Sequence, residues 1–267
     1  MAYVDNAHGS DHHWNYDDDS GYGPTHWSGY CNLPEYRRQS PIDLNSATST
    51  PDDSLGSIDL DDYGKTCSFS ASNNGHSFDG GGLSDRYSLI QFNFHWGGGR
   101  FEGSEYTVDG LVYPLEAHLV HLKESLTVEE AKKRHDGLAV LGVFYNVTDE
   151  LMAEPTTLDL ETVYAMRRAL EPVVALQKPG GSDSRPSISL APASLLPGDK
   201  AFYRYNGSLT TPDCSEAVIW TVFRQPLIIL PEQVALLRSL NNAEQKPLLR
   251  NFRPIQPTNG RSALTTF

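Results

Sequence analysis

Two short segments place histidines at spacings that suit a metal site. Residues 91–96 read Gln-Phe-Asn-Phe-His-Trp, and residues 116–121 read Glu-Ala-His-Leu-Val-His. Their aromatic and branched side chains predict two β-strands. Because side chains alternate along a strand, Asn93 and His95 share one face of the first, and His118 lies on the same face of the second as Glu116.

Pairing of the two strands with these faces together would bring Asn93, His95 and His118 to one place. Two imidazoles there would suit zinc, with Gln91 or Glu116 orienting them from behind. The alternative is that these histidines are hydrogen-bonded core residues that bind no metal. The spacing by itself leaves both interpretations open.

The elements that must position these residues are mainly strands. Runs of apolar residues bounded by Gly, Pro, Asp or Asn predict strands at Ser88–Trp96, Glu105–Val108, Glu116–Leu122, Leu138–Val147 and Ala217–Phe223. Shorter helical patterns cover Val128–His135, Leu158–Leu170 and Pro231–Leu240. We therefore expect a mainly β fold with peripheral helices, in a single domain over residues 1–267 whose first 12 residues form a flexible tail.

Composition excludes several classes of protein. The chain has 267 residues, and 21 Lys+Arg against 34 Asp+Glu give a net charge of −13. A nucleic-acid-binding protein needs a basic face, so nucleic acid is excluded as a partner. No apolar run reaches the roughly 18–20 residues that span a bilayer. The acidic runs at residues 17–19, 52–53 and 59–62 would bind calcium weakly, or serve only as a solvated surface.

Seven segments, in order along the chain, are more specific than any single spacing. They read His13-Trp14-Asn15-Tyr16, Arg37-Arg38-Gln39-Ser40-Pro41-Ile42, Gln91–Trp96, Gly103-Ser104-Glu105, Glu116–His121, Gly207-Ser208-Leu209-Thr210-Thr211-Pro212 and Asn251-Phe252-Arg253-Pro254. Together they resemble the α-class carbonic anhydrases over nearly the whole chain. The resemblance implies one domain on a large, twisted, mostly antiparallel sheet, with the site in a cone-shaped cleft.

The resemblance also implies a ligand set for Zn²⁺. The family holds zinc with three histidines, two at alternate positions of one strand and a third on the neighbouring strand. By position, His95 and His118 match the second and third ligands, whereas Asn93 stands where the family has its first histidine. An amide oxygen is a poorer zinc donor than imidazole, so we expect weak or partial zinc occupancy.

Most other site positions match the family. The resemblance makes Glu116 and Asn251 the partners behind His118 and His95, and Gln91 the support of the first ligand. It implies that Thr210 and Glu105 orient the zinc-bound hydroxide, that His76 shuttles protons, and that Tyr16 orders water in the cleft. The implied carbon dioxide pocket consists of Val120, Val140, Leu209, Thr211, Val218 and Trp220.

Cysteines and sequons bear on the compartment. Secreted members of the family have a disulfide at the positions of Cys31 and Cys214. The resemblance therefore implies that these two cysteines pair and that Cys67 is the third, unassigned cysteine. Asn146 and Asn206 begin Asn-X-Ser/Thr sequons and are glycosylation candidates. We therefore expect a secreted, extracellular protein whose signal peptide is not in this chain. A further departure is Tyr106, where the family usually has histidine.

Two functions follow from the resemblance. The first is zinc-hydroxide hydration of CO2 to bicarbonate, weakened or lost because of Asn93, and inhibited by sulfonamides if zinc is bound. The second is a catalytically silent extracellular relative that serves as an acidic binding or structural module, associated with calcium or mineral.

Overall fold

The computed structural model describes residues 14–58, 60, 63–73, 78–81, 87–124, 126–148, 157–176, 187–242 and 244–267. Strands dominate this part of the chain, and helices are short. The strands are β1 Asp43–Leu44, β2 Thr50–Pro51, β3 Cys67–Asn73, β4 Phe78–Gly81, β5 Tyr87–Trp96, β6 Thr107–Val108, β7 Leu115–Lys123, β8 Leu138–Val147, β9 Ser187–Leu190, β10 Phe202–Gly207, β11 Val218–Phe223, β12 Leu227–Ile229 and β13 Leu264–Thr265. The α-helices are α1 Val128–Ala131, α2 Thr157–Leu170 and α3 Pro231–Arg238. The 3₁₀-helices are η1 Asp18–Ser20, η2 Pro24–His26, η3 Asp53–Leu55, η4 Glu171–Leu176 and η5 Pro192–Leu195.

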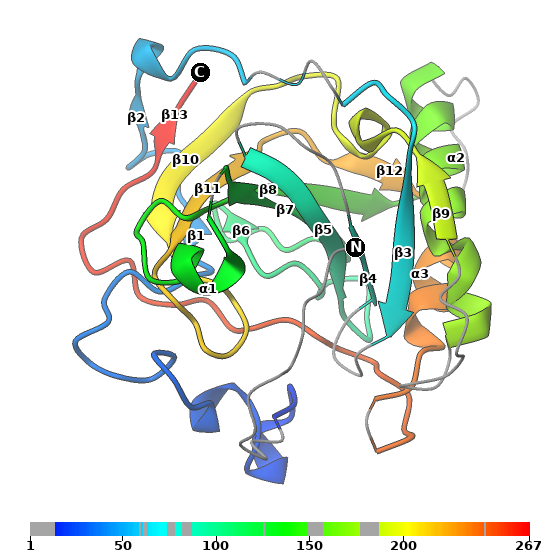
Figure 1. Cartoon of the computed structure of the whole chain (residues 1–267), viewed down its shortest axis with the longest axis horizontal. Helices are drawn as coiled ribbons and strands as arrows, with labels where there is room; N and C mark the ends of the chain where they lie inside the picture. Colours follow the sequence, from blue (N-terminus) through cyan, green and yellow to red (C-terminus); the bar gives the residue numbers. More distant parts are fainter. Residues whose placement is uncertain are drawn as a thin grey trace.

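One large sheet organises these elements (Figure 1). Its order is β2-β13-β10-β11-β8-β7-β5-β4-β3-β9, with β12 pairing alongside β8. Pairs in the middle, such as β5 with β7 and β7 with β8, are antiparallel, whereas β8 is parallel to both β11 and β12. The expected mainly β, single-domain fold is confirmed, and the sheet is mixed with an antiparallel majority.

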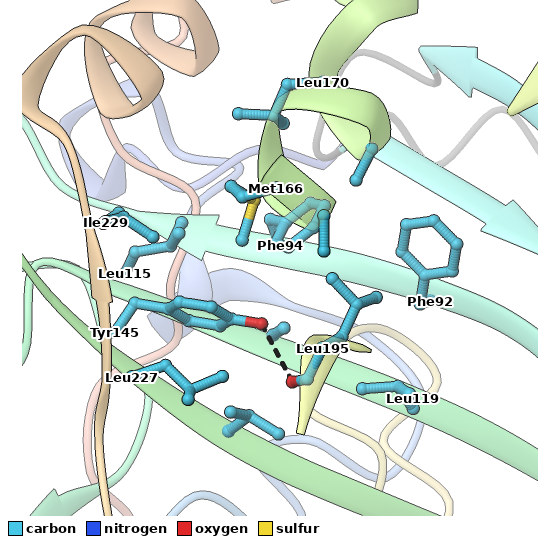
Figure 2. Packing of buried hydrophobic residues seen from close by; sticks show 14 of the residues in the cluster. Phe92, Phe94, Leu115, Leu119, Tyr145, Met166, Leu170, Leu195, Leu227 and Ile229 are labelled. Atoms are coloured by element: carbon cyan, nitrogen blue, oxygen red, sulfur yellow. Dashed lines mark hydrogen bonds between the residues drawn. The ribbon is translucent and has the colours of Figure 1, made fainter. Parts of the chain in front are cut away.

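The main hydrophobic core lies between one face of the sheet and the helices α2 and α3 (Figures 1 and 2). Phe92 and Phe94 point into it from β5, because alternate residues of a strand share a face. Met166 and Leu170 close it from α2. Asn93 and His95 therefore belong to the other face, which is left for the site.

The expected helix at Val128–His135 is shorter than its pattern suggested. Thr127 and Glu130 form a capping box at its start, but α1 ends at Ala131. Beyond it the backbone bonds span three residues, from Lys133 to Glu130 and from Arg134 to Ala131. The chain must turn there because strand β8 begins at residue 138, beside β7. By contrast, α2 and α3 lie where their patterns predicted them.

A covalent link joins the N-terminal segment to the far part of the chain. Cys31 and Cys214 form a disulfide, with their Cα atoms 5.0 Å apart. Tyr16, Trp27 and Trp14 pack around it in a small separate cluster. The pairing expected from the resemblance is thus present, and Cys67 is the remaining cysteine. No helix in the described residues is long and apolar enough to cross a membrane.

Removal of this disulfide should cost much stability. The two cysteines are 183 residues apart in sequence, and a link of that span restricts the unfolded chain by about 5 kcal/mol in the chain-entropy account. We expect the double variant Cys31→Ala/Cys214→Ala to lose about that much unfolding free energy in urea denaturation. Cys67→Ala is the matched control and should change it far less. Equal stabilities of the two variants would contradict this expectation.

Candidate metal centre

The register of β5 against β7 brings the candidate ligands together. Asn93 lies opposite His118, and His95 lies opposite Glu116. The rings of His95 and His118 are 4.5 Å apart between centroids, and both side chains are buried. The amide nitrogen of Asn93 is 2.9 Å from His95 Nε2. The three residues of the two predicted strands thus occupy one place on one face of the sheet.

One ring nitrogen of each histidine has a hydrogen-bond partner in the protein. His95 Nδ1 lies 2.8 Å from the backbone carbonyl of Asn251, and His118 Nε2 lies 2.7 Å from Glu116 Oε1. Since a carbonyl only accepts, His95 carries its proton on Nδ1. Burial lowers the pKa of His95 to about 4 and that of His118 to about 3, so both rings are neutral at pH 7. His95 Nε2 therefore keeps its lone pair. When Glu116 is ionised, His118 Nε2 donates to it, and His118 Nδ1 then keeps its lone pair as well.

The side chain of Asn251 acts differently from the expectation. Its Oδ1 accepts a hydrogen bond from Trp96 N at 2.7 Å, and its Nδ2 donates to Phe94 O at 2.8 Å. The amide therefore fixes the backbone of β5 on both sides of His95, while the Asn251 carbonyl orients the ring itself. The prediction placed Asn251 behind His95, and the structure divides that task between backbone and side chain.

Asn93 meets His95 through its nitrogen. Because His95 Nε2 has only a lone pair, the Asn93 amide must donate to it. Asn93 Oδ1 is buried and has no hydrogen-bond partner among the residues that the structure describes. A buried acceptor without a donor is costly, and a cation beside it would remove that cost.

Two buried carboxyl groups lie beside the histidines. Glu116 Oε2 accepts hydrogen bonds from the backbone nitrogens of Glu105 and Tyr106, at 2.9 and 3.0 Å. Glu105 lies 3.5 Å from His95 Nδ1 and accepts from the Arg253 backbone nitrogen at 2.7 Å. Burial raises the pKa of Glu105 to about 7 and that of Glu116 to about 8, against the lowering effect of these hydrogen bonds.

Thr210 lies next to Glu105, the carboxylate with which it was predicted to orient a zinc-bound hydroxide. Its side chain is hydrogen-bonded to Glu105, which lowers the pKa of that carboxyl against the effect of burial. Beyond it in the chain, the Thr211 carbonyl accepts from Cys214 N at 2.8 Å, so the loop leads directly into the disulfide. The structure therefore places Thr210 and Glu105 together at the buried histidines.

Arg253 was not assigned a role from the sequence. Its guanidinium is buried and donates to the carbonyls of Ser40 and Cys31, each at 2.8 Å, and to Gln39 Oε1 at 3.0 Å. With its backbone nitrogen on Glu105, Arg253 connects the carboxylate to the N-terminal segment. The only sequence signal was its place in the Asn251–Pro254 segment.

The predicted apolar pocket residues also gather. Val120, Val140, Val218 and Trp220 are buried in one cluster, against which the half-buried Leu209 packs. The ring of Trp220 lies 4.7 Å from that of His118. An apolar wall thus borders the histidines, and the half-buried Thr211 continues the loop beyond Leu209.

The remaining predicted site residues are His76, Gln91 and Tyr16. His76 lies outside the described residues. Gln91 is on β5 but makes no hydrogen bond to Asn93 in the part of the chain described. Tyr16 is buried among Trp14 and Trp27, with both ring centroids 5.5 Å away, and burial raises its pKa with a smaller contribution from Glu105.

The donor set suits a metal ion. His95, Glu105 and His118 offer ligand atoms that lie within 4.8 Å of one another. Two neutral imidazoles with oxygen donors nearby are ligands that zinc accepts. The uncompensated Asn93 oxygen beside them is the observation that favours a cation there.

The comparisons with known proteins agree with this arrangement. A sequence model of the eukaryotic-type carbonic anhydrase family matches residues 22–267. The chain belongs to the eukaryotic-type carbonic anhydrase family. Carbonic anhydrases typically use zinc and act on carbon dioxide and bicarbonate.

Individual carbonic anhydrases are similar along almost their full length. The chain is 40% identical to putative carbonic anhydrase 5 of Caenorhabditis elegans, over 98% of this chain and 84% of that protein. It is 36% identical to human carbonic anhydrase 7, over 96% of this chain and 98% of that protein. Putative carbonic anhydrase 3 of C. elegans is 35% identical, over 93% of this chain and 96% of that protein.

A third buried histidine in this carbonic anhydrase homologue gives a pH prediction. His121, on the opposite face of β7 from His118, contacts Tyr63 Oη and lies 3.1 Å from the Ala139 carbonyl. Burial lowers its pKa to about 4 from an unfolded value of 6.5. The unfolded chain therefore binds its proton first as pH falls, and this group's contribution to stability is lost between about pH 6.5 and 4.

His121→Gln should remove that dependence. Since one proton changes the unfolding free energy by about 1.4 kcal/mol per pH unit, the slope between pH 4 and 6.5 should fall by up to that amount. Urea denaturation of metal-free protein at several pH values measures it. His135→Gln, at an exposed position in the turn after α1, is the control. An unchanged slope in His121→Gln would show that His121 is not the titrating group.

Proposed function

We propose that this protein hydrates carbon dioxide to bicarbonate at a zinc centre weakened by Asn93. His95 Nε2, His118 Nδ1 and Asn93 Oδ1 would hold the ion, with Asn93 in the position of the family's first histidine. The observation that carries the proposal is that two buried, neutral imidazoles lie beside Asn93, whose buried Oδ1 has no hydrogen-bond partner among the described residues. When bound, zinc acts as a Lewis acid that lowers the pKa of water.

The hydrogen bond between Asn93 and His95 explains why affinity should be low. The Asn93 amide nitrogen donates to the same His95 lone pair that a metal needs. Metal binding must break this bond and turn the amide so that its oxygen faces the ion. The amide oxygen is then a weaker donor than imidazole, so both effects reduce affinity.

Thr210 and Glu105 would orient the nucleophile. Glu105, when ionised, only accepts hydrogen bonds, so the Thr210 hydroxyl must donate to it. The lone pairs of Thr210 Oγ1 can then accept a hydrogen bond from the attacking oxygen, which orients it.

The apolar wall would receive the substrate. Val120, Val140, Val218 and Trp220 present no charge to carbon dioxide, and bicarbonate is better solvated by water than by this wall. Product release is thereby favoured. We further propose that His76 exports the proton, with Tyr16 bordering the water in the cleft.

The compartment that we propose is extracellular. The Cys31–Cys214 disulfide supports it, because such links persist in oxidising surroundings. Asn146 on β8 and Asn206 on β10 are both exposed, as glycan acceptors must be. Secretion would make both sequons available for glycosylation.

The silent, calcium-associated alternative gains less support. Asp17 and Asp52 use their carboxylates to accept from the backbone nitrogens of Asp19 and Ser54, which caps the turns η1 and η3. Asp18 accepts from Thr25. These acidic groups already have local partners, and Asp59, Asp61 and Asp62 lie outside the described residues.

Asn93→His should strengthen the centre. Restoring a third imidazole should tighten zinc at least about 100-fold, since even changes behind a ligand cost about 10- to 100-fold. We expect faster carbon dioxide hydration at limiting zinc and tighter binding of a primary sulfonamide. Stopped-flow hydration and zinc titration of the chelator-treated protein measure these quantities.

The matched control is Asn146→His, the same change at an exposed position on β8. It should leave both quantities unchanged. If the native protein binds zinc and hydrates carbon dioxide as well as Asn93→His does, the centre is not weakened. If only Asn93→His binds zinc and is active, the native protein is the silent alternative.

A further inference from the structure

A chain of buried hydroxyl groups runs from the metal centre to the loop that carries Thr210. Tyr106 Oη lies 2.6 Å from Tyr205 Oη, which lies 2.6 Å from Ser40 Oγ. Ser208 N donates to Ser40 Oγ at 3.0 Å, and Ser40 N donates to Ser208 Oγ at 2.9 Å. We call these four residues the hydroxyl ladder.

The ladder ends next to Thr210. Ser208 Oγ also donates to the Leu209 carbonyl at 2.7 Å, and the Ser208 carbonyl accepts from Trp220 Nε1 at 2.9 Å. Both carbonyls and the Ser208 amide are thus fixed in the two residues that precede Thr210. A change in this backbone would move the Thr210 hydroxyl relative to Glu105.

The other end of the ladder is the support of His118. The Tyr106 backbone nitrogen donates to Glu116 Oε2, and Glu116 Oε1 holds His118. The Tyr106 ring is fully buried, with its centroid 5.0 Å from that of Trp220. One residue therefore serves the histidine through its backbone and the loop through its hydroxyl.

Gly207 makes the close approach of Ser40 feasible. A Cβ at this position would overlap Ser40 Oγ, and it would come within 2.9 Å of the Tyr205 ring. Only a residue without a side chain leaves room for Ser40 between β10 and the loop. The absence of a side chain at Gly207 therefore allows Ser40 to take its position in the hydroxyl ladder.

We propose that Tyr106 is a positioning residue that sets the place of Thr210 through Tyr205, Ser40 and Ser208. The inference rests on the proposed function for its kinetic consequence, but the link from Tyr106 to the loop is a property of the metal-free chain. Tyr106 is also, after Asn93, a second position at which the sequence departs from the family pattern, where histidine is expected. A phenol reaches the hydroxyl of Tyr205 directly.

Tyr106→Phe tests the link, because it removes one hydroxyl and keeps both the ring and the backbone bond to Glu116. In the chelator-treated protein, the amide hydrogens of Ser208 and Leu209 should exchange with deuterium about tenfold faster. Tyr205→Phe, which breaks the middle of the ladder, should do the same. With zinc bound, kcat for carbon dioxide should fall about tenfold with KM unchanged, and zinc affinity should stay within about threefold.

The matched control is Tyr145→Phe. Tyr145 is equally buried and its hydroxyl donates to the Leu195 carbonyl at 3.1 Å, but it lies in the core cluster on the other face of the sheet (Figure 2). It should leave the exchange at Ser208 and Leu209, and kcat, as in the native protein.

Native exchange at Ser208 and Leu209 in both Tyr106→Phe and Tyr205→Phe would overturn the proposal. An equal acceleration in Tyr145→Phe would also overturn it, because the effect would then be general destabilisation. If the native protein fails to hydrate carbon dioxide, the proposed function fails, and the exchange measurements alone decide on the ladder.

Discussion

The register between β5 and β7 is the constraint on which the site depends. Asn93 opposite His118 and His95 opposite Glu116 place Asn93 and the two histidines on one face of the sheet. The same register sends Phe92 and Phe94 into the core beneath α2. A slip of one residue would exchange the two faces, burying imidazoles among apolar side chains. Formation of the core and formation of the site are therefore one event.

Burial of charge is the second feature of the centre. Glu105, Glu116 and Arg253 are all buried, where an isolated charge would be costly. The structure offsets part of this cost with backbone donors on both carboxyl groups and with carbonyl acceptors around the guanidinium. The remaining cost raises the pKa of Glu105 to about 7 and that of Glu116 to about 8. These bonds fix the groups in place before any ligand arrives, which is what a catalytic or metal centre requires.

The loop that carries Thr210 is held from several sides. The disulfide to Cys31 fixes it after Thr211, the ladder through Ser40 fixes it before Thr210, and Glu105 binds Thr210 itself. These contacts come from Cys31, Ser40 and Glu105, which all lie more than 100 residues before the loop in sequence. Such convergence explains why a long loop can carry a well-placed hydroxyl.

The sequence by itself determined the strands of the site, and through family resemblance it predicted the pairing of Cys31 with Cys214 and a departure at Asn93. Alternation along a strand is local, so the shared face of Asn93 and His95 needed no tertiary information. Contacts between distant segments could not be derived in this way. The buried bonds of Arg253 and the link from Tyr106 to Ser208 depend on how strands and loops pack. A hydrogen bond between residues far apart in sequence has no periodic signature, so only the tertiary structure decided which partners these groups have.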